Sequence, residues 1–302
     1  MENTKKTLLI ATDSFLPRWD GVTRFIIEIL PALKDQYNVT LLVPDFGEIN
    51  EELGVRIVKI PVYEKQFGDF QLAKPKFKEI KKIVETADAV FCQTIGPIGY
   101  LSMRYASKLK IPLFSYTHSI ESDLAIKSIK PVFPFKTVLN IFVKTYAKNA
   151  YNKCDLIFVP YHDLATDLDD FGIKARKKVV HLGVNPDEFN PELPKDVIKE
   201  ALGLKGKFVI GYLGRIANEK DIPTLYRAFK KLQKEQPNVA LLIVGTGLSH
   251  LEKKLRNDDS VKLVGSTSQA SKYYAAMDIY VLPSLLETTS LTTLEANGNW
   301  IT

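Results

Sequence analysis

The chain has 302 residues, of which 45% are hydrophobic and 25% are charged. This composition is that of a globular protein and excludes a disordered or fibrous chain, while the length favours two domains. There are 41 Lys and Arg residues against 35 Asp and Glu, which leaves a net charge of +6. So small an excess does not predict a nucleic-acid partner, but it favours an anionic ligand or surface.

Cysteine usage and hydropathy bear on location. Cys92 and Cys154 are too few for a disulfide framework, so each is expected to be a buried free thiol. The first apolar run is too short for a signal peptide, and no stretch reaches the roughly 18 apolar residues that span a bilayer. The sequence therefore predicts a cytoplasmic protein and leaves open a peripheral position on the membrane's cytoplasmic face.

Short apolar runs alternate with helical patterns along the first 180 residues. This alternation predicts a parallel sheet covered by helices on both faces. The predicted strands are Thr7–Thr12, Val39–Pro44, Val55–Val62, Ala89–Gln93, Leu113–Tyr116 and Leu156–Pro160. The predicted helices are Arg24–Lys34, Lys76–Thr86, Gly99–Leu109, Thr137–Asn152 and Asp163–Phe171.

A second alternating series follows a stretch rich in Gly, Pro and Asn. Its predicted strands are Phe208–Leu213, Val239–Val244, Val261–Val264 and Ile279–Leu282, and its predicted helices are Ile222–Glu235, Ser249–Asn257 and Gln269–Ala276. The predicted domains are residues 1–182 and 207–302, joined by a connector over residues 183–206. The predicted fold class is α/β, with two doubly wound, Rossmann-like lobes that face each other across a cleft, where the strand-to-helix loops meet a ligand.

Two loops of the first lobe carry candidate residues. Gly21 lies just ahead of a predicted helix, where free N–H groups and the positive helix end suit an anion; the alternative is a turn glycine. His118 lies just past a strand end and is expected to project into the cleft, not the core, as a polar contact or proton carrier, although a lone histidine is more often structural. His162 also follows a strand and is a weaker candidate.

Two cations follow the first strand of the second lobe. Arg215 offers a planar fork and Lys220 a compact charge, a combination that suits a diphosphate. Both precede a helix expected to begin near Asp221 or Ile222, where the macrodipole disfavours positive charge, so an anionic ligand would resolve the conflict.

Two carboxylates, Glu287 and Glu295, lie eight positions apart after the last predicted strand. Glu287 is expected on the loop and Glu295 inside the next helix, which opens with the capping residues 288–290 and unpaired N–H groups suited to an anion. The alternative is an exposed capping sequence with an ordinary surface glutamate.

Taken together, these segments resemble the retaining glycosyltransferases of family four, which have the two-lobed GT-B fold. The resemblance covers nearly the whole chain. It rests on Gly21, Thr117-His118, the connector His181–Phe189, Gly214-Arg215 with Lys220, Val244–Gly247, Asp278 with Pro283-Ser284, and the pair Glu287 and Glu295.

The resemblance implies a role for each matching residue. Arg215 and Lys220 would neutralise the diphosphate of a nucleotide-sugar donor, with the N–H groups of Leu291 and Thr292 at a helix start and Gly21 from the other lobe. Glu295 would bind the ribose, Gly245 and Gly247 would line the nucleotide pocket, and His118 and Glu287 would contact the transferred sugar. Neither a cofactor nor a metal is implied, and Asp167 and Asp169 are interpreted as a solvated helix surface.

The end of the chain departs from the family pattern. After Glu295-Ala296 the family usually continues with a further strand and helices, whereas this sequence ends at Thr302, and Ser290 stands where glycine is frequent. The hypothesis is therefore a C-terminally truncated enzyme with an incomplete second lobe.

The stretch Lys127–Lys153 contains no acidic residue. Lys136, Lys144 and Lys148 recur at multiples of four, and an apolar stripe is formed by Val138, Leu139, Phe142 and Tyr146. This pattern suits an anionic membrane surface and a lipid acceptor. An ordinary helix that covers the sheet with a solvated lysine face is the simpler interpretation.

The leading functional prediction is transfer of a hexose from a UDP- or GDP-sugar to a lipid or glycan acceptor. Two alternatives are a sugar-nucleotide 2-epimerase on the same fold and an inactive, truncated nucleotide-binding remnant. Nucleic-acid binding is disfavoured, because the charge excess is small and no recognition module is apparent. The sugar, the base, the acceptor and the oligomeric state are left open.

Overall fold

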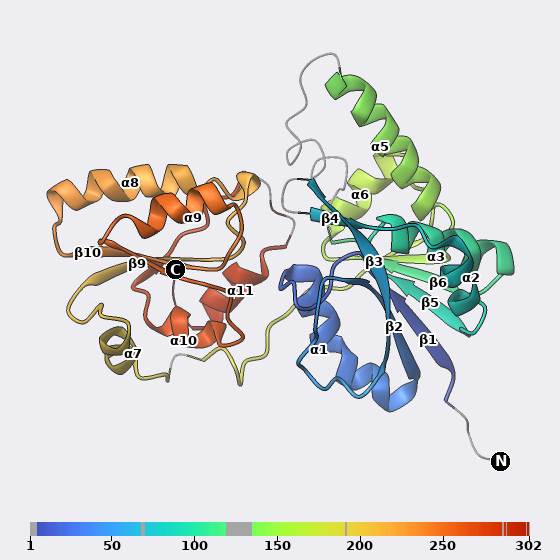
Figure 1. Cartoon of the computed structure of the whole chain (residues 1–302), viewed down its shortest axis with the longest axis horizontal. Helices are drawn as coiled ribbons and strands as arrows, with labels where there is room; N and C mark the ends of the chain where they lie inside the picture. Colours follow the sequence, from blue (N-terminus) through green and yellow to red (C-terminus); the bar gives the residue numbers. More distant parts are fainter. Residues whose placement is uncertain are drawn as a thin grey trace. The chain divides into compact units, whose positions relative to one another are not determined.

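The computed structural model describes residues 5–67, 70–118, 135–190, 192–285, 287, 289–299 and 301. The chain divides into two compact units, Met1–His181 and Leu182–Thr302, and each contains its own sheet (Figure 1).

The first unit is built on a sheet with the strand order β4-β3-β2-β1-β5-β6-β7-β8. Its strands are β1 (Thr7–Ala11), β2 (Asn38–Asp45), β3 (Arg56–Phe67), β4 (Phe70–Ala73), β5 (Ala89–Cys92), β6 (Leu113–Tyr116), β7 (Leu156–Val159) and β8 (Lys177–Val179). All neighbours pair in parallel except β3 and β4. The strand order reverses between β1 and β5, and the carboxyl ends at such a reversal are where ligands bind in open α/β sheets.

Helices cover both faces of this sheet. They are α1 (Gly21–Gln36), α2 (Phe77–Val84), α3 (Pro97–Leu109), α5 (Phe135–Tyr151) and α6 (His162–Asp170). Leu9 and Ala11 of β1 belong to the core cluster that α2, α3, α5 and α6 complete. Their neighbours Leu8 and Ile10 point to the opposite face, because side chains alternate along a strand, and α1 covers that face with Ile26 (Figure 1).

The second unit has a parallel sheet with the order β11-β10-β9-β12. Its elements are β9 (Phe208–Leu213), β10 (Val239–Val244), β11 (Val261–Val264), β12 (Ile279–Tyr280), α7 (Lys195–Ala201), the 3-10 helix η1 (Asn218–Lys220), α8 (Ile222–Glu235), α9 (Ser249–Arg256), α10 (Ala270–Ala275) and α11 (Leu291–Gly298). The helices α8 and α9 lie on one face and α7, α10 and α11 on the other (Figure 1). Every residue of β10 is therefore buried, as its unbroken apolar run predicts.

The predicted strands and helices are confirmed, and the α/β, two-lobed fold class with them. The sequence did not reveal β4, β8 and α7. The strands β4 and β8 are short edge strands, and β8 begins with Lys177-Lys178, so neither has the apolar run of a central strand. Residues 183–206, predicted as a connector, carry α7 and contribute Phe189, Ile198 and Leu204 to the core of the second unit.

Asp278 explains how this connector is attached. Its carboxylate accepts hydrogen bonds from Lys199 and from the backbone N–H of Val209, and it pairs with Lys195 at 2.8 Å. Burial raises the pKa of Asp278, but the lysine and backbone hydrogen bonds outweigh it and hold the pKa below its usual range. This residue of the family pattern therefore joins α7 to the sheet.

Among the described residues, no helix combines the length and the hydropathy that are needed to cross a membrane.

Candidate functional site

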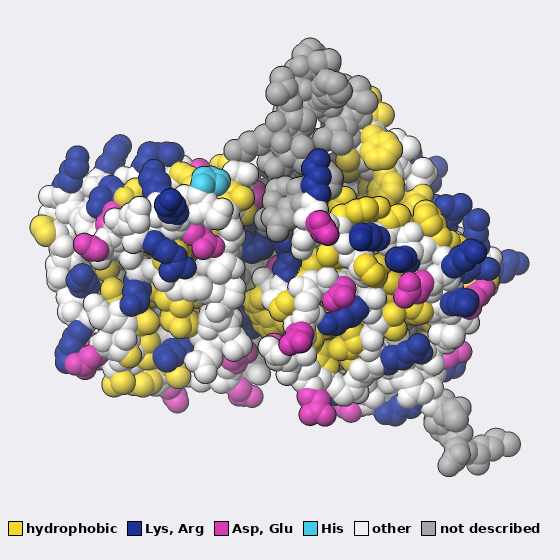
Figure 2. Space-filling view, in the orientation of Figure 1, with side chains coloured by type: hydrophobic (Ala, Val, Ile, Leu, Met, Phe, Trp, Pro, Cys, Tyr) yellow, Lys and Arg dark blue, Asp and Glu magenta, His cyan; other side chains and the backbone are white. Residues whose placement is uncertain are grey.

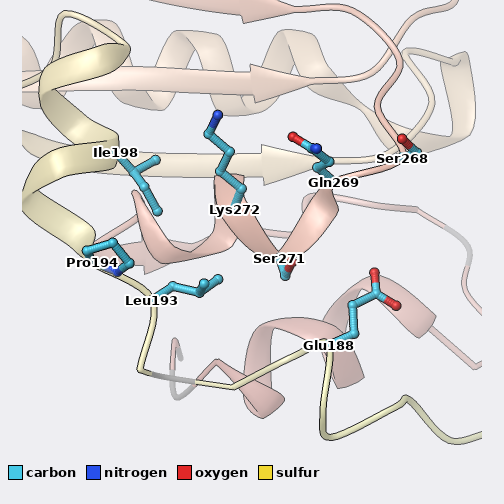
Figure 3. A pocket seen from close by; sticks show the side chains of 8 residues that line it. All are labelled: Glu188, Leu193, Pro194, Ile198, Ser268, Gln269, Ser271 and Lys272. Atoms are coloured by element: carbon cyan, nitrogen blue, oxygen red, sulfur yellow. The ribbon is translucent and has the colours of Figure 1, made fainter.

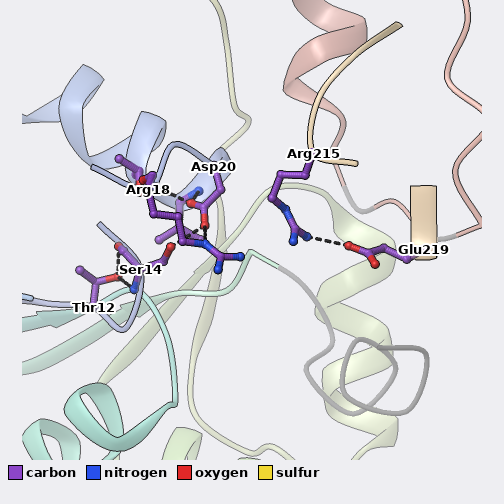
Figure 4. A network of polar contacts seen from close by, with 8 residues as sticks. Thr12, Ser14, Arg18, Asp20, Arg215 and Glu219 are labelled. Carbon is purple, nitrogen blue, oxygen red and sulfur yellow. Dashed lines mark hydrogen bonds and ion pairs between the residues drawn. The ribbon is translucent and has the colours of Figure 1, made fainter. Parts of the chain in front are cut away.

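Arg215 lies on the loop that follows β9. Its Nη2 is 2.6 Å from Oε1 of Glu219, a side chain on η1 that is only 5% exposed (Figure 4). At the other end of the residue, the Tyr212 hydroxyl donates to the backbone carbonyl of Arg215 at 2.7 Å. Arg215 is therefore held both at its guanidinium and at its backbone carbonyl.

Lys220 ends η1, and its ammonium forms an ion pair with the Glu287 carboxylate. Glu287 comes from the loop after β12, and the backbone N–H of Leu285 on that loop donates to the carbonyl of Glu219 at 2.8 Å. Because β12 pairs directly with β9, the loops that leave these two strands lie side by side. The structure thus brings Glu287, which the sequence placed on a separate loop, to Lys220 on the segment that also carries Arg215.

The electrostatic prediction for these cations is corrected by the ion pairs. The sequence left two positive charges uncompensated at the start of α8, which begins at Ile222 as expected. Glu219 and Glu287 supply one carboxylate to each cation, so the chain itself resolves the conflict. The case for an anionic ligand rests instead on accessibility, since the side chains of Arg215 and Lys220 remain 22% and 18% exposed.

The first turn of α11 lies beside the same loop. Ser290 is its N-cap and accepts the N–H of Thr293 at 3.2 Å, while Thr288 lies outside the described residues. The Tyr280 hydroxyl donates to Oγ1 of Thr292 at 2.7 Å. In the part of the chain that the structure describes, the N–H groups of Leu291 and Thr292 have no acceptor. Such groups suit an anion.

Glu295 lies on the inner side of α11 and is buried. The Tyr274 hydroxyl is 2.9 Å from Oε2 of Glu295 and also 2.9 Å from the carbonyl of Thr292. The carboxylate therefore helps to hold α11 against α10. Its contact with a ribose stays a prediction.

Gly245 and Gly247 follow β10, where the chain packs against the loop after β9. A Cβ at Gly245 would lie 2.0 Å from the carbonyl oxygen of Gly214, and a Cβ at Gly247 would lie 2.1 Å from that of Ile216. Both positions therefore require glycine for backbone packing. That they also line a nucleotide pocket stays a prediction.

In the first unit, Gly21 begins α1 instead of preceding it. The Asp20 carboxylate is the N-cap, and its Oδ1 accepts the N–H groups of Val22 at 3.1 Å and Thr23 at 3.0 Å. The expectation that the first turn of α1 presents free N–H groups is therefore wrong for these two residues. A Cβ at Gly21 would meet no atom within 4 Å, so space for a close approach is present.

A polar network fixes this helix start. Ser14 and Arg18 both donate to Oδ2 of Asp20, and Thr12 donates to the carbonyl of Ser14 at 2.9 Å (Figure 4). Asp13, next in the chain to Ser14, crosses to the loop after β5, where its Oδ2 accepts the Thr94 hydroxyl at 2.7 Å. The carboxyl ends of β1 and β5 are thereby tied together.

His118 lies after β6, packed between aromatic rings. The ring centroids of Phe25 and Tyr116 are 5.1 and 4.8 Å away, and Nε2 is 3.1 Å from Oε1 of Gln93. Burial lowers the pKa of His118 to about 4, against a smaller opposing effect of the Asp20 charge. The imidazole is therefore neutral at physiological pH, which suits a hydrogen bond better than a cationic contact.

Sequence reasoning missed Gln93, which was taken only as the end of a strand. Its position could have indicated a functional role, because this amide side chain directly follows the apolar run of β5, at the carboxyl end of the strand. Of the other histidines, His162 begins α6 and His181 lies 2.8 Å from the carbonyl of Pro160. Neither approaches a candidate group in the described contacts.

No cluster of three or more His, Cys, Asp or Glu side chains that could hold a metal occurs among the described residues. Asp169 pairs with Lys177 at 2.6 Å on the surface of α6. A separate open pocket of about 550 Å³ lies between the segment around α7 and α10 (Figure 3). Its lining includes Leu193, Ile198 and Lys272 but none of the predicted site residues.

Two family models together match most of the chain. Residues 19–188 match the family model Glycosyltransferase Family 4, and residues 207–298 match the model Glycosyl transferases group 1. The chain belongs to glycosyltransferase family 4.

Relatives include two alpha-monoglucosyldiacylglycerol synthases. The Streptococcus pneumoniae protein is 27% identical over 94% of this chain and 67% of its own length. The Acholeplasma laidlawii protein is 24% identical over 95% of this chain and 77% of its own length. Among solved structures, Anabaena HepE in complex with UDP and glucose has a TM-score of 0.76 and 17% identity, covering 98% of this chain and 79% of that one.

The protein is thus a glycosyltransferase with the GT-B fold. The 2-epimerase alternative is not favoured, because both family models that match are described as glycosyltransferases.

Proposed function

We propose that this glycosyltransferase moves a hexose from a UDP- or GDP-sugar to a lipid acceptor at an anionic membrane surface, with retention of the anomeric configuration. The observation that carries the proposal is the ion pair of Lys220 with Glu287, which joins the loop that leads into α11 to the segment that carries Arg215 and Lys220.

Cleavage of a sugar–phosphate bond builds negative charge on the departing diphosphate. Arg215 and Lys220, with the N–H groups of Leu291 and Thr292, would stabilise that charge more strongly in the transition state than in the ground state. In this proposal the phosphate takes the place of Glu287 at Lys220, and the released carboxylate turns to the transferred sugar. His118 would contact the same sugar as a neutral hydrogen-bonding group.

The exposed side chains of α5 support a lipid acceptor. Ala147 and Ala150 in its second half are buried, so this half covers the sheet as the simpler interpretation expected. Ile141 and Phe142, one to two turns earlier, are exposed, and Figure 2 shows hydrophobic side chains at the surface over α5. An exposed aromatic side chain on a lysine-rich segment suits an anionic bilayer. Residues 127–134 and the side chains of residues 135–140 lie outside the description.

The names of the two synthases support the same acceptor class, since both contain diacylglycerol. In the face drawn in Figure 2, Lys and Arg side chains are otherwise mixed with Asp and Glu over both units. The segment around α5 is therefore the preferred membrane contact.

The membrane contact can be tested by replacing the exposed aromatic residue of α5. Phe142→Ser should weaken binding to anionic vesicles about tenfold, because a partly inserted aromatic ring contributes roughly 1.5 kcal/mol. Co-sedimentation with phosphatidylglycerol vesicles at low salt measures it. Phe77→Ser is the matched control, since Phe77 on α2 is also exposed (52%, against 65% for Phe142). Equal binding by the two variants and the wild type would remove the membrane assignment.

The function itself is tested by product analysis. The protein is incubated with UDP-glucose, UDP-galactose or GDP-mannose and with diacylglycerol in mixed micelles that contain phosphatidylglycerol. A glycolipid with the donor's anomeric configuration, seen by proton NMR, is the expected product. Transfer only to soluble glycans would reject the lipid acceptor, and donor binding without transfer to any acceptor would favour the inactive-remnant alternative.

A further inference from the structure

Gln93 occupies a buried position at the carboxyl edge of the first sheet. It directly follows β5, its side chain is 2% exposed, and its Oε1 lies 3.1 Å from Nε2 of His118. Because β5 and β6 are neighbours, with Cys92 opposite Ser115, the residues just beyond their ends meet. The backbone on this side is tied down, since the adjacent Thr94 is hydrogen-bonded to Asp13.

The Nε2 atom of the Gln93 amide is buried and makes no hydrogen bond with any residue that the structure describes. A buried donor without an acceptor destabilises the folded state, and an apolar side chain of similar size would avoid that loss. Packing and stability therefore do not favour glutamine here, which points to a role for its other polar atom.

That other atom, Oε1, can only accept a hydrogen bond. A neutral imidazole has one N–H donor and one acceptor nitrogen, and the partner of one nitrogen decides which tautomer is present. The rings of Phe25 and Tyr116 limit rotation of the imidazole about its own axis. Together, the Gln93 amide oxygen and the two aromatic rings can define both the orientation and the tautomer of the His118 ring.

We propose that Gln93 is a positioning residue for sugar transfer: its carbonyl oxygen accepts the Nε2 proton of His118 and holds the ring as the tautomer whose Nδ1 carries the lone pair. This inference rests on the proposed function, in which His118 contacts the transferred sugar. Gln93 itself touches no substrate in this account. It acts by fixing the orientation of the His118 ring and the nitrogen that carries its proton.

Nitrogen-15 NMR of the imidazole tests the geometry without any activity. His118→Gln identifies the signal. The wild type should show the Nε2–H tautomer at pH 7, and Gln93→Leu should shift the signal toward a mixture of both tautomers. Gln93→Glu keeps an acceptor but adds a carboxylate, so the pKa of His118 should rise by about 1–3 units. Asp20, whose charge already acts on His118, and Tyr116, whose own pKa burial raises, are unchanged in both variants.

Kinetics test the role in transfer. Gln93→Leu should lower kcat by about 10- to 100-fold through misorientation of His118, with the donor KM within about twofold. Its thermal stability should stay close to that of the wild type, because removal of the unpaired Gln93 Nε2 offsets loss of the hydrogen bond to His118, whereas loss of a purely structural residue would lower it. Gln93→Glu should recover much of kcat at high pH and lose it as the pH falls through the raised pKa, because the imidazolium no longer has an acceptor nitrogen.

Ser102→Ala is the matched control. Ser102 on α3 is fully buried, and its Oγ also has no partner among the described residues, so its removal should change neither the His118 signal nor kcat. An unchanged tautomer in Gln93→Leu would overturn the inference even if transfer activity were found. If instead no nucleotide sugar is turned over, the proposed function fails, while the NMR result still decides whether Gln93 controls His118.

Discussion

Lys220→Ala is expected to abolish most of the thermal stabilisation that a nucleotide-sugar donor gives the wild-type protein. A ligand at 100 times its dissociation constant stabilises the folded state by about 2.7 kcal/mol. Loss of one fixed cation from the diphosphate should weaken binding by roughly 100-fold, which leaves about 0.4 kcal/mol at the same ligand concentration. A thermal-shift titration with UDP- and GDP-sugars measures the difference.

The structure makes Lys220 a cleaner test than Arg215. Glu287, the partner of Lys220, is on a partly exposed loop, so the donor-free stability of Lys220→Ala should be close to that of the wild type. Arg215→Ala leaves the buried Glu219 carboxylate unpaired and should also lower donor-free stability. The double variant Arg215→Ala/Glu219→Gln removes that unpaired charge and isolates the loss of donor binding.

Lys205→Ala is the control, since Lys205 pairs with Glu200 at 2.9 Å in the same unit and both side chains are well exposed. Its donor-induced shift should match that of the wild type. If Lys220→Ala responds to donor as the control does, the diphosphate does not bind at this loop, and the proposed donor site is wrong.

Glu287→Gln should separate binding from transfer. In the donor-free protein the Glu287 carboxylate occupies Lys220, so it competes with a diphosphate for that cation. A partly exposed ion pair contributes at most about 1 kcal/mol, so its removal should tighten UDP or GDP binding by up to about fivefold. Transfer should nevertheless fall by about 100- to 1,000-fold, because a polar group at the reacting sugar is lost.

Calorimetry with the free nucleotide and single-turnover rates with the nucleotide sugar measure the two effects separately. Glu200→Gln, which breaks the exposed pair with Lys205, should change neither. A Glu287→Gln variant with weaker nucleotide binding and normal transfer would show that the carboxylate supports the diphosphate site and has no part in the chemistry.

Most of the fold could be predicted because its central strands are buried on both faces. The apolar runs of β1, β2, β9 and β10 report that burial directly, and the glycines after β9 and β10 mark the loops that pack closely. The edge strands β4 and β8 are half-solvated and leave no such pattern, and α7 is too short to show a helical period.

The candidate site, too, could be predicted only in part. The types and order of Arg215, Lys220, Glu287 and Glu295 could be read from the chain, because each lies on the loop or in the helix that follows a recognisable strand. Their partners could not, because Glu287 reaches Lys220 only through the pairing of β12 with β9, and the inward direction of Glu295 depends on where Tyr274 lies. The amino-acid sequence thus determined which strands form and which loops carry charge, since local patterns encode burial. Tertiary structure alone decided that each cation has a carboxylate partner and that Gln93 meets His118, since contacts between distant segments depend on strand order and leave no local pattern.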